Sequence, residues 1–158
     1  MHNTVVRLPN VYGPRASIHS PEYTFNNYFV GLALQNKDIT VYGDGKQLRN
    51  SIYVDDAVDA LIMAAGANHQ CGQTYLAVHD EHFSVAEIAA TTIRSIGTGR
   101  VKSVEWPRGR KSIEIGDAVF SNVKIKKDLG WFPKYSLNEG LVITGDYYRS
   151  RIKNYLFL

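Results

Sequence analysis

The sequence predicts an α/β fold in which a small mixed sheet is packed against helices. Two observations lead to this prediction. Short runs of β-branched and apolar residues alternate along the chain with segments whose apolar residues recur at helical spacing. The 158 residues, 44% hydrophobic and 21% charged, are ordinary for one globular domain. We therefore expect a single domain over residues 1–158.

Extended segments supply the expected strands, which cover residues 4–8, 39–42, 51–54, 74–78 and 101–106. The first is rich in β-branched and apolar residues and predicts a buried strand, whereas the last alternates and predicts a half-buried one. Glycine and proline in 11–22 predict a loop, and the glycines of 43–45 predict a turn. Residues 107–117 are expected to form a basic loop.

Helical spacing predicts five helices, over residues 23–36, 55–67, 85–96, 122–129 and 137–155. Asp55 is a candidate N-cap for the second. Ser84 and Glu87 have the spacing of a capping box before the third, and Gly97 is suited to end it. Gly130 is suited to end the fourth helix.

Composition narrows the classes of function. The net charge is +3 and the pI about 8.9, without runs of lysine or arginine, so we expect a small anionic ligand and no nucleic acid. No apolar run approaches the roughly 20 residues that cross a bilayer, and no signal peptide is expected. A single cysteine, Cys71, excludes an intrachain disulfide and fits a cytoplasmic protein. The histidines show no metal-binding spacing.

One stretch, residues 41–56, contains the most suggestive residues: VYGDGKQLRNSIYVDD. Tyr42 and Lys46 have the Tyr-x-x-x-Lys spacing of a short-chain dehydrogenase active site. That chemistry needs both side chains one turn apart on a helix. Gly43 and Gly45 each cost a helix roughly 1 kcal/mol relative to alanine, so we expect a turn and no catalytic pair here. Asp55 and Asp56 suit a helix N-terminus better than paired acid–base work.

Three segments together resemble the extended short-chain dehydrogenase/reductase family, the NAD-dependent nucleotide-sugar epimerases and dehydratases. They are RLPNVYGPR at 7–15, the stretch at 41–56, and DLGWFP followed by SLNEGL within 128–141. Their order resembles the carboxy-terminal half of that family, in particular UDP-sugar 4-epimerases and decarboxylases and dTDP-sugar dehydratases. The resemblance implies the C-terminal substrate-binding portion of a Rossmann-like enzyme, with residues 1–15 ending a missing NAD-binding domain.

The same resemblance implies what this chain lacks. The family's Gly-rich turn, which places the NAD pyrophosphate on a helix N-terminus, has no counterpart in the sequence. The family's helical Tyr-x-x-x-Lys precedes the segment that resembles 7–15. We therefore expect no catalytic residue in this chain, NAD or NADP only in the complete family enzyme, and no tightly bound cofactor in the chain alone. The expected partners are the missing NAD-binding portion and, through the exposed edge of strand 4–8, a second copy.

The resemblance assigns the diphosphate of a nucleotide sugar to Arg49, because a guanidinium grips phosphate with paired hydrogen bonds. The alternative is an ion pair with Asp55 or Asp56. It also assigns the nucleotide base to Tyr42 and to the backbone of Thr40, against the alternative of an ordinary half-buried strand tyrosine.

Further substrate contacts are implied at Asn10, after a strand's C-terminal end, and at Asn27 on the first helix. Turn formation is the alternative for Asn10. Leu8 and Pro9 would lie against the nicotinamide in a complete enzyme.

The basic loop is the second implied source of substrate contacts. Arg108 or Arg110 would contact the diphosphate or ribose, and Asp117 or Glu114 would bind ribose hydroxyls. A solvated basic loop is the alternative for any one of them. For the whole chain, the alternative function is a structural or protein-interaction domain without a ligand.

Overall fold

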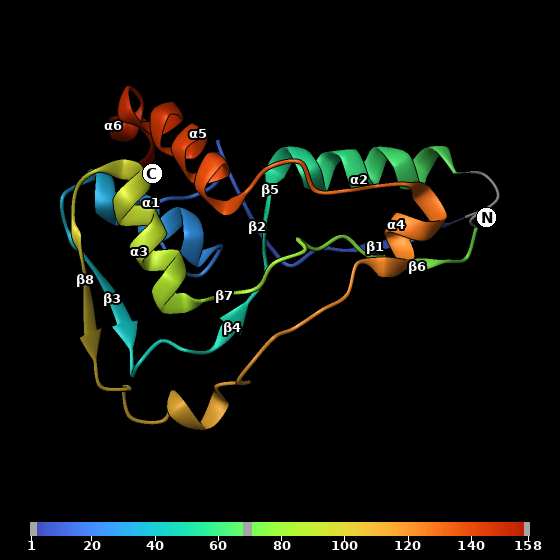
Figure 1. The fold of residues 1–158 in the computed structure, drawn as a ribbon. Coiled ribbons are helices and arrows are strands. Elements are labelled where there is room, and N and C mark those ends of the chain that lie inside the picture. Colours follow the sequence, from blue (N-terminus) through green and yellow to red (C-terminus); the bar gives the residue numbers. More distant parts are fainter. Residues whose placement is uncertain (1–2, 68–70, 157–158) are drawn as a thin grey trace.

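The computed structural model describes residues 3–67 and 71–156, which form two lobes (Figure 1). The helical lobe holds α1, β3, α3, β8, α5 and α6, and the small lobe holds β1, α2, β6 and α4. The helices are α1 (Phe25–Leu34), α2 (Val54–Gly66), α3 (Val85–Ile96), α4 (Val123–Leu129), α5 (Leu137–Arg149) and α6 (Ile152–Leu156). The strands are β1 (Val5–Arg7), β2 (Asn10–Tyr12), β3 (Asp38–Tyr42), β4 (Leu48–Arg49), β5 (Ser51–Tyr53), β6 (Thr74–Leu76), β7 (Phe83–Ser84) and β8 (Arg100–Val104).

The described strands form four two-stranded pairs, not one mixed sheet. Three pairs are parallel, β1 with β6, β2 with β5 and β3 with β8, and β4 pairs antiparallel with β7. The predicted α/β class with small parallel sheets and packed helices is thus confirmed in its coarser form. Three of the described strands differ from expectation. The short strands β4 and β7 lie outside the predicted strands. β2 lies where the sequence predicts a loop, because residues 10–12 pair with β5, which is about 40 residues further along the chain.

Helix ends agree best with the sequence where the signal is local. The predicted capping box of α3 is present, with Ser84 and Glu87 bonded to each other's backbone, and Gly97 ends the helix at φ 87°. Gly130 ends α4 in the same way, at φ 67°. The last predicted helix is divided into α5 and α6, with Ser150 at the C-cap of α5.

Three local predictions are wrong. The sequence predicts a buried β1, yet Val5 is 47% exposed, because β6 is its only strand partner among the described residues. The sequence also predicts a half-buried β8. This strand is mostly exposed, because β3 is its only strand partner among the described residues. Helix α2 begins at Val54, one residue earlier than predicted, and Asp55 lies in its first turn instead of capping it.

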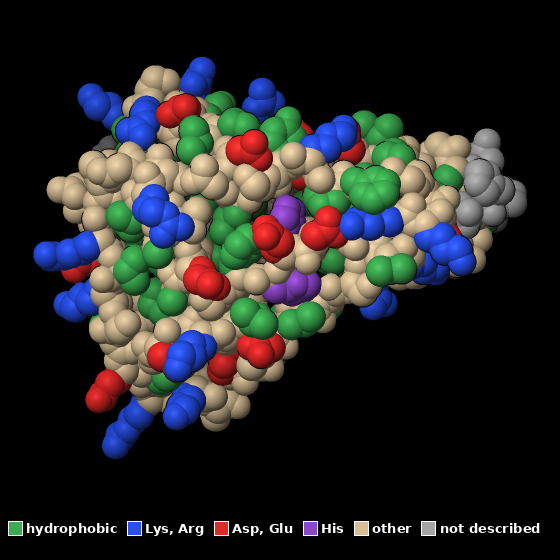
Figure 2. All heavy atoms as spheres, in the orientation of Figure 1, with side chains coloured by type: hydrophobic (Ala, Val, Ile, Leu, Met, Phe, Trp, Pro, Cys, Tyr) green, Lys and Arg blue, Asp and Glu red, His purple; other side chains and the backbone are tan. Residues whose placement is uncertain are grey.

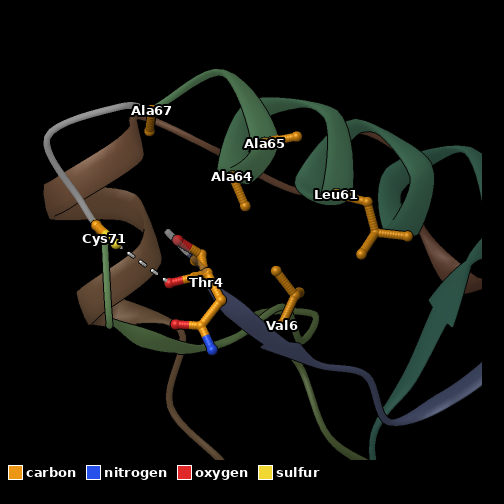
Figure 3. A pocket seen from close by; sticks show the side chains of 8 residues that line it. Thr4, Val6, Leu61, Ala64, Ala65, Ala67 and Cys71 are labelled. Carbon is orange, nitrogen blue, oxygen red and sulfur yellow. Dashed lines mark hydrogen bonds between the residues drawn. The ribbon is translucent and has the colours of Figure 1, made fainter. Parts of the chain in front are cut away.

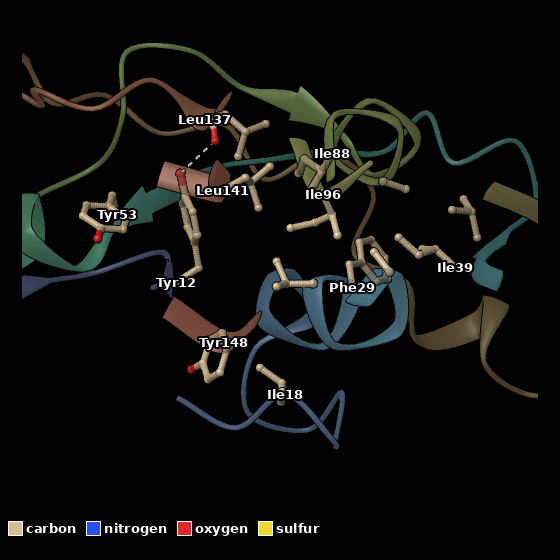
Figure 4. Close-up of a cluster of buried hydrophobic side chains, with 14 residues drawn as sticks. Tyr12, Ile18, Phe29, Ile39, Tyr53, Ile88, Ile96, Leu137, Leu141 and Tyr148 are labelled. Atoms are coloured by element: carbon tan, nitrogen blue, oxygen red, sulfur yellow. Dashed lines mark hydrogen bonds between the residues drawn. The ribbon is translucent and has the colours of Figure 1, made fainter. Parts of the chain in front are cut away.

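The core of the helical lobe is the larger of two apolar clusters (Figure 4). Phe29 from α1, Ile88 from α3 and Leu141 from α5 converge there. Tyr12 enters the same cluster from β2, and its hydroxyl donates to the carbonyl of Leu137 at 3.3 Å. Burial raises the pKa of Tyr12 far above its ordinary value, so this hydroxyl stays a donor. The cluster thereby fixes α1 and α5 relative to β2.

A second cluster occupies the small lobe around Trp131, which is 1% exposed. Its indole Nε1 donates to the backbone carbonyl of Asp56 at 3.1 Å, joining the segment after α4 to the start of α2. The buried members of this cluster are Ile52, Ala57, Ala60, Tyr75, Ala77, Ile125 and Trp131. β2 and β5 lie between the two lobes, and the segments from β6 to β7, into α4 and from α4 to α5 also pass between them (Figure 1).

The small lobe also holds a cavity of about 670 Å³ between α2 and β1 (Figure 3). Leu61 and Ala64 of α2 and Val6 of β1 line it, and Cys71 donates a weak hydrogen bond to the carbonyl of Asn3 at 3.8 Å. Polar and apolar surface contribute about equally to its lining, and no charged side chain is among the described lining residues, so this cavity offers little for a charged ligand. Among the described helices, none is long and apolar enough to cross a bilayer.

Candidate functional site

The candidate site is a cavity of about 580 Å³ in the helical lobe, where α1, β3, β4 and the basic loop meet. Residues of α1 contribute much of its apolar lining, and the other elements add polar, charged and aromatic residues. The lining residues are Pro21, Phe25, Tyr28, Phe29, Leu32, Asp38, Thr40, Val41, Tyr42, Gln47, Arg49, Val85, Trp106, Arg110, Ile113 and Glu114. Predicted ligand residues from three separate segments therefore meet here: Thr40 and Tyr42, Arg49, and Arg110.

The turn after β3 separates Tyr42 from Lys46. Gly43 and Gly45 both have φ 64°, which a helix does not allow. The Lys46 side chain is 84% exposed and pairs with Asp44 at 3.2 Å, away from the cavity. The prediction of a turn in place of a helical Tyr–Lys pair is confirmed.

Arg49 lies at the end of β4 with its side chain only 14% exposed. Its Nη1 donates to the carbonyls of Leu48, at 2.8 Å, and Gly116, at 2.5 Å. Its Nη2 donates to the carboxylate of Glu114 in the basic loop. The ion-pair partner is thus Glu114, and not Asp55 or Asp56, which the sequence offered as the alternative.

Tyr42 and Trp106 form an aromatic wall of the cavity. Their ring centroids are 5.4 Å apart, with 36° between the planes. Gly43 permits this approach, because a Cβ there would lie 2.6 Å from Nε1 of Trp106. Sequence reasoning did not single out Trp106. The pairing of β3 with β8, which puts Tyr42 opposite Val104, is the signal that would have placed Trp106 nearby.

The basic loop contributes fewer of the predicted residues to the cavity lining than its composition suggested. Arg110 lines the cavity, whereas Arg108 is exposed and is not among the lining residues. Asp117 is exposed, and its carboxylate accepts the backbone N–H of Leu48 at 2.8 Å. Asp117 therefore ties the loop to β4, while Glu114 is the loop's acid on the cavity wall.

Asn10 and Asn27 lie outside the cavity lining. Asn10 donates to the carbonyl of Asn50 at 2.9 Å. Asn27 is fully buried: its Oδ1 accepts from the N–H of Gly13 at 3.0 Å, and its Nδ2 donates to the Gly13 carbonyl at 2.7 Å and to Tyr148. These contacts give Asn27 a structural role at the Gly13 turn, since no exposed surface is left for a ligand.

Leu8 and Pro9 follow the end of β1, also outside the cavity lining, and Leu8 is 38% exposed. Their contact with a nicotinamide stays a prediction. Within the described range, no helix begins directly after a Gly-rich turn of the kind that holds a pyrophosphate.

Asn50 is a second residue that sequence reasoning missed. It is 1% exposed, directly after Arg49. Its Oδ1 accepts from the N–H of His79 at 2.8 Å, and its Nδ2 donates to the carbonyls of His79 and Glu81 at 2.9 and 3.0 Å. Asn50 thereby binds the loop after β6 to the end of β4, which helps to hold Arg49 in place.

Asp56 also has a role that its position in the sequence did not reveal. Its side chain is 1% exposed and accepts the backbone N–H groups of Lys134, at 2.9 Å, and Tyr135, at 3.2 Å. Burial raises the pKa of Asp56, and these two hydrogen bonds oppose the rise. Asp56 therefore holds the segment before α5 through two backbone hydrogen bonds, in addition to lying in the first turn of α2.

His82 connects the segment after the basic loop to the loop before β7. Its Nε2 accepts the N–H of Phe120 at 2.9 Å, which requires that nitrogen to be unprotonated. Burial, and secondarily the charge of His79, lowers the pKa of His82. The unfolded chain therefore binds this proton more readily, and stability falls as the pH drops through the unfolded value near 6.5.

We expect His82→Gln to reduce the loss of stability between about pH 7.5 and 5.5 by up to about 1 kcal/mol, the worth of one hydrogen bond. The glutamine oxygen can accept from Phe120 but does not titrate. Urea unfolding at the two pH values measures the effect, and His19→Gln, at an exposed histidine elsewhere, is the matched control. Equal pH dependence in the wild type and His82→Gln would contradict this assignment.

Charges on the face that Figure 2 shows are interspersed, with lysine and arginine beside aspartate and glutamate and no extended basic patch. Within the described residues, no group of three histidine, cysteine, aspartate or glutamate side chains is arranged to hold a metal ion; His69 lies outside that range. The cavity lining combines two arginines, Arg49 and Arg110, with two carboxylates, Asp38 and Glu114, and several aromatic rings. This is an α/β protein with a cavity that brings charged side chains and aromatic rings together.

Comparison with known proteins makes this class more specific. The pattern of the NAD dependent epimerase/dehydratase family matches residues 1–78. UDP-glucuronic acid decarboxylase 2 of Arabidopsis thaliana is 33% identical over 153 residues, which cover 94% of this chain and 32% of that protein. The chain is a partial-length relative of the NAD-dependent epimerase/dehydratase family.

Solved structures agree with this assignment. The UDP-glucose 4-epimerase of Thermotoga maritima, solved with UDP-glucose, has a TM-score of 0.83 and 27% identity, covering 94% of this chain and 46% of that one. The UDP-glucose 4-epimerase of Thermus thermophilus, solved with NAD, has a TM-score of 0.78 and 25% identity, covering 96% and 48%. The chain thus spans about a third to a half of the length of these relatives.

Proposed function

We propose that this chain is the nucleotide-sugar-binding portion of an NAD-dependent epimerase, dehydratase or decarboxylase, and that its cavity takes the nucleotide diphosphate of a UDP- or dTDP-sugar. One observation carries the proposal. Thr40, Tyr42, Arg49 and Arg110, each assigned to such a ligand from the sequence, line the same cavity. The UDP-glucose bound to the Thermotoga maritima relative supports the choice of ligand class.

Charge and shape suggest how the ligand would lie. The diphosphate would lie at the end of the cavity near Arg49 and Arg110, because guanidinium groups bind phosphate oxygens with short, charge-assisted hydrogen bonds. The base would lie against the aromatic wall of Tyr42 and Trp106, whose flat faces suit a pyrimidine. The backbone of Thr40 on β3 would then read the edge of the base.

The chemical step would need more than these residues. In this family NAD, when bound, supplies the hydride-transfer chemistry. We propose that the 158 residues bind and orient the sugar nucleotide, that Leu8 and Pro9 border the nicotinamide, and that turnover requires a separate NAD-binding portion. Stoichiometric NAD in the purified chain, or turnover of a UDP-sugar by it, would contradict this proposal.

Trp106 provides the direct test of the cavity. We expect UDP to quench the fluorescence of Trp106, and Trp106→Ala to weaken UDP binding by about 1–3 kcal/mol, the range for one stacked base. The other tryptophan, Trp131, is buried in the small lobe, so Trp106→Phe should abolish the quenching. Tyr23→Ala removes a 76% exposed aromatic residue outside the cavity and is the control. Quenching that survives Trp106→Phe would rule out this cavity.

An interaction domain without a ligand is the second candidate, and exposed apolar side chains favour it. Val58, Leu61, Ile62 and Met63 of α2 are 44%, 46%, 64% and 37% exposed. This surface would also suit contact with the NAD-binding portion or with a second copy of the chain. Failure of both UDP and dTDP to bind, together with self-association in sedimentation, would favour this candidate.

A further inference from the structure

The guanidinium of Arg49 is already engaged by the chain itself. Its Nη1 is bonded to the carbonyls of Leu48 and Gly116, and its Nη2 to the carboxylate of Glu114. The side chains of Arg49 and Glu114 are 14% and 22% exposed, so solvent screens the pair only partly. In this state three of the five guanidinium N–H donors are engaged, so the end-on pair of Nη1 and Nη2 is not free to bind a phosphate.

Glu114 is held in this position by its own loop. The N–H of Gly116 donates to the Glu114 carboxylate at 3.2 Å. Asp117 accepts the N–H of Leu48 at 2.8 Å, and the N–H of Ala118 donates to the Leu48 carbonyl at 3.0 Å. The loop therefore presents the carboxylate to Arg49 from a segment that is itself joined to β4.

A carboxylate and a phosphate compete for the same donors. Both accept paired, charge-assisted hydrogen bonds from a guanidinium. Glu114 lines the cavity in which the proposed function places the diphosphate. We propose that Glu114 is an internal counter-anion that an incoming diphosphate must displace from Arg49, so that Glu114 limits affinity for phosphate-bearing ligands and leaves other ligands unaffected. The inference rests on the proposed function for the identity of its natural ligand.

This role makes a prediction opposite to that of a substrate-binding acid. If the Glu114 carboxylate accepted hydrogen bonds from ribose hydroxyls, its removal would weaken every ribose-containing ligand. If the carboxylate competes for Arg49, its removal raises the affinity only of those ligands that bind Arg49 through phosphate. Uridine and UDP share the base and the ribose and differ in the diphosphate, so they separate the two roles.

The experiment titrates inorganic pyrophosphate, UDP and uridine into the wild-type chain and Glu114→Gln by calorimetry. Glutamine keeps the size of the side chain and one acceptor while removing the charge. We expect Glu114→Gln to bind pyrophosphate and UDP about tenfold more tightly, the scale of one charge-assisted contact. Uridine affinity should not change, which also reports that the variant is folded.

Asp38→Asn is the matched control. Asp38 lines the same cavity, but its carboxylate is paired with Arg100 at 2.6 Å and not with Arg49. Removing this charge changes the potential of the cavity by a similar amount and leaves the Arg49–Glu114 contact in place. Equal tightening in Asp38→Asn and Glu114→Gln would attribute the effect to net charge and overturn the proposal.

The remaining outcomes are equally decisive. Weaker binding of both UDP and uridine by Glu114→Gln would overturn the proposal in favour of a ribose contact, and unchanged affinities would overturn it outright. Pyrophosphate binding by no variant would also overturn it. If UDP and uridine bind no variant while pyrophosphate binds Glu114→Gln more tightly, the counter-anion role stands and the proposed nucleotide-sugar function fails.

Discussion

Replacing Arg49 with alanine is expected to weaken UDP binding by about 1.5–3 kcal/mol, the worth of hydrogen bonds to a charged group. Two effects combine. The diphosphate loses its guanidinium, and Glu114 loses the partner that neutralises it on the cavity wall. The second effect leaves an unpaired carboxylate on the wall of the cavity proposed to take the diphosphate.

Calorimetry with UDP measures this loss, and Lys46→Ala is the matched control. Lys46 belongs to the turn between β3 and β4, but its side chain is 84% exposed and outside the cavity. Its removal should leave the affinity nearly unchanged. The double variant Arg49→Ala/Glu114→Ala should recover part of the loss, because the unpaired carboxylate is then absent. Unchanged affinity in Arg49→Ala would remove Arg49 from the site.

Replacing Asp56 with alanine is expected to lower the free energy of unfolding by roughly 2–4 kcal/mol. The substitution leaves the backbone N–H groups of Lys134 and Tyr135 without their acceptor. It also loosens the start of α2 next to Trp131, whose indole donates to the Asp56 carbonyl. The junction between α2 and the segment before α5 depends on these contacts.

Urea unfolding measures the loss of stability in Asp56→Ala. Asp55→Ala is the control, since Asp55 is the exposed carboxylate next to Asp56 in the same helical turn. It should cost no more than about 0.5 kcal/mol, the range of a surface substitution. Asp56→Asn keeps one acceptor and should fall between the two. Equal losses in Asp55→Ala and Asp56→Ala would show that both act only through the helix dipole.

Local sequence signals predicted the helices well. The capping box of Ser84 and Glu87 and the glycine stops at Gly97 and Gly130 depend on residues within one turn of each other. Such interactions form in the same way wherever the helix is placed, so a pattern of a few residues suffices. The turn at Gly43 and Gly45 was predictable for the same reason, since two positive φ angles so close together suit glycine.

Pairing over long distances was not predictable from the sequence. Residues 10–12 contain the loop-like Asn10 and precede Gly13, yet they form β2 because β5 offers a parallel partner. β1 has the composition of a buried strand but remains exposed, because burial depends on what packs against it. Composition reports what a segment tolerates, whereas pairing is decided by which segments the rest of the chain brings together.

In the candidate site, too, some features were predictable from the sequence and others depended on long-range contacts. The sequence by itself determined which residues have suitable chemistry, Arg49 for an anion and Tyr42 for a flat ring, because donors and aromatic faces belong to the side chain. Only the tertiary structure decided their surroundings: Trp106 beside Tyr42, and Glu114 against Arg49 across 65 residues of sequence. The physical reason is that the charge and shape of a cavity are sums over distant segments, and those segments meet only in the folded chain.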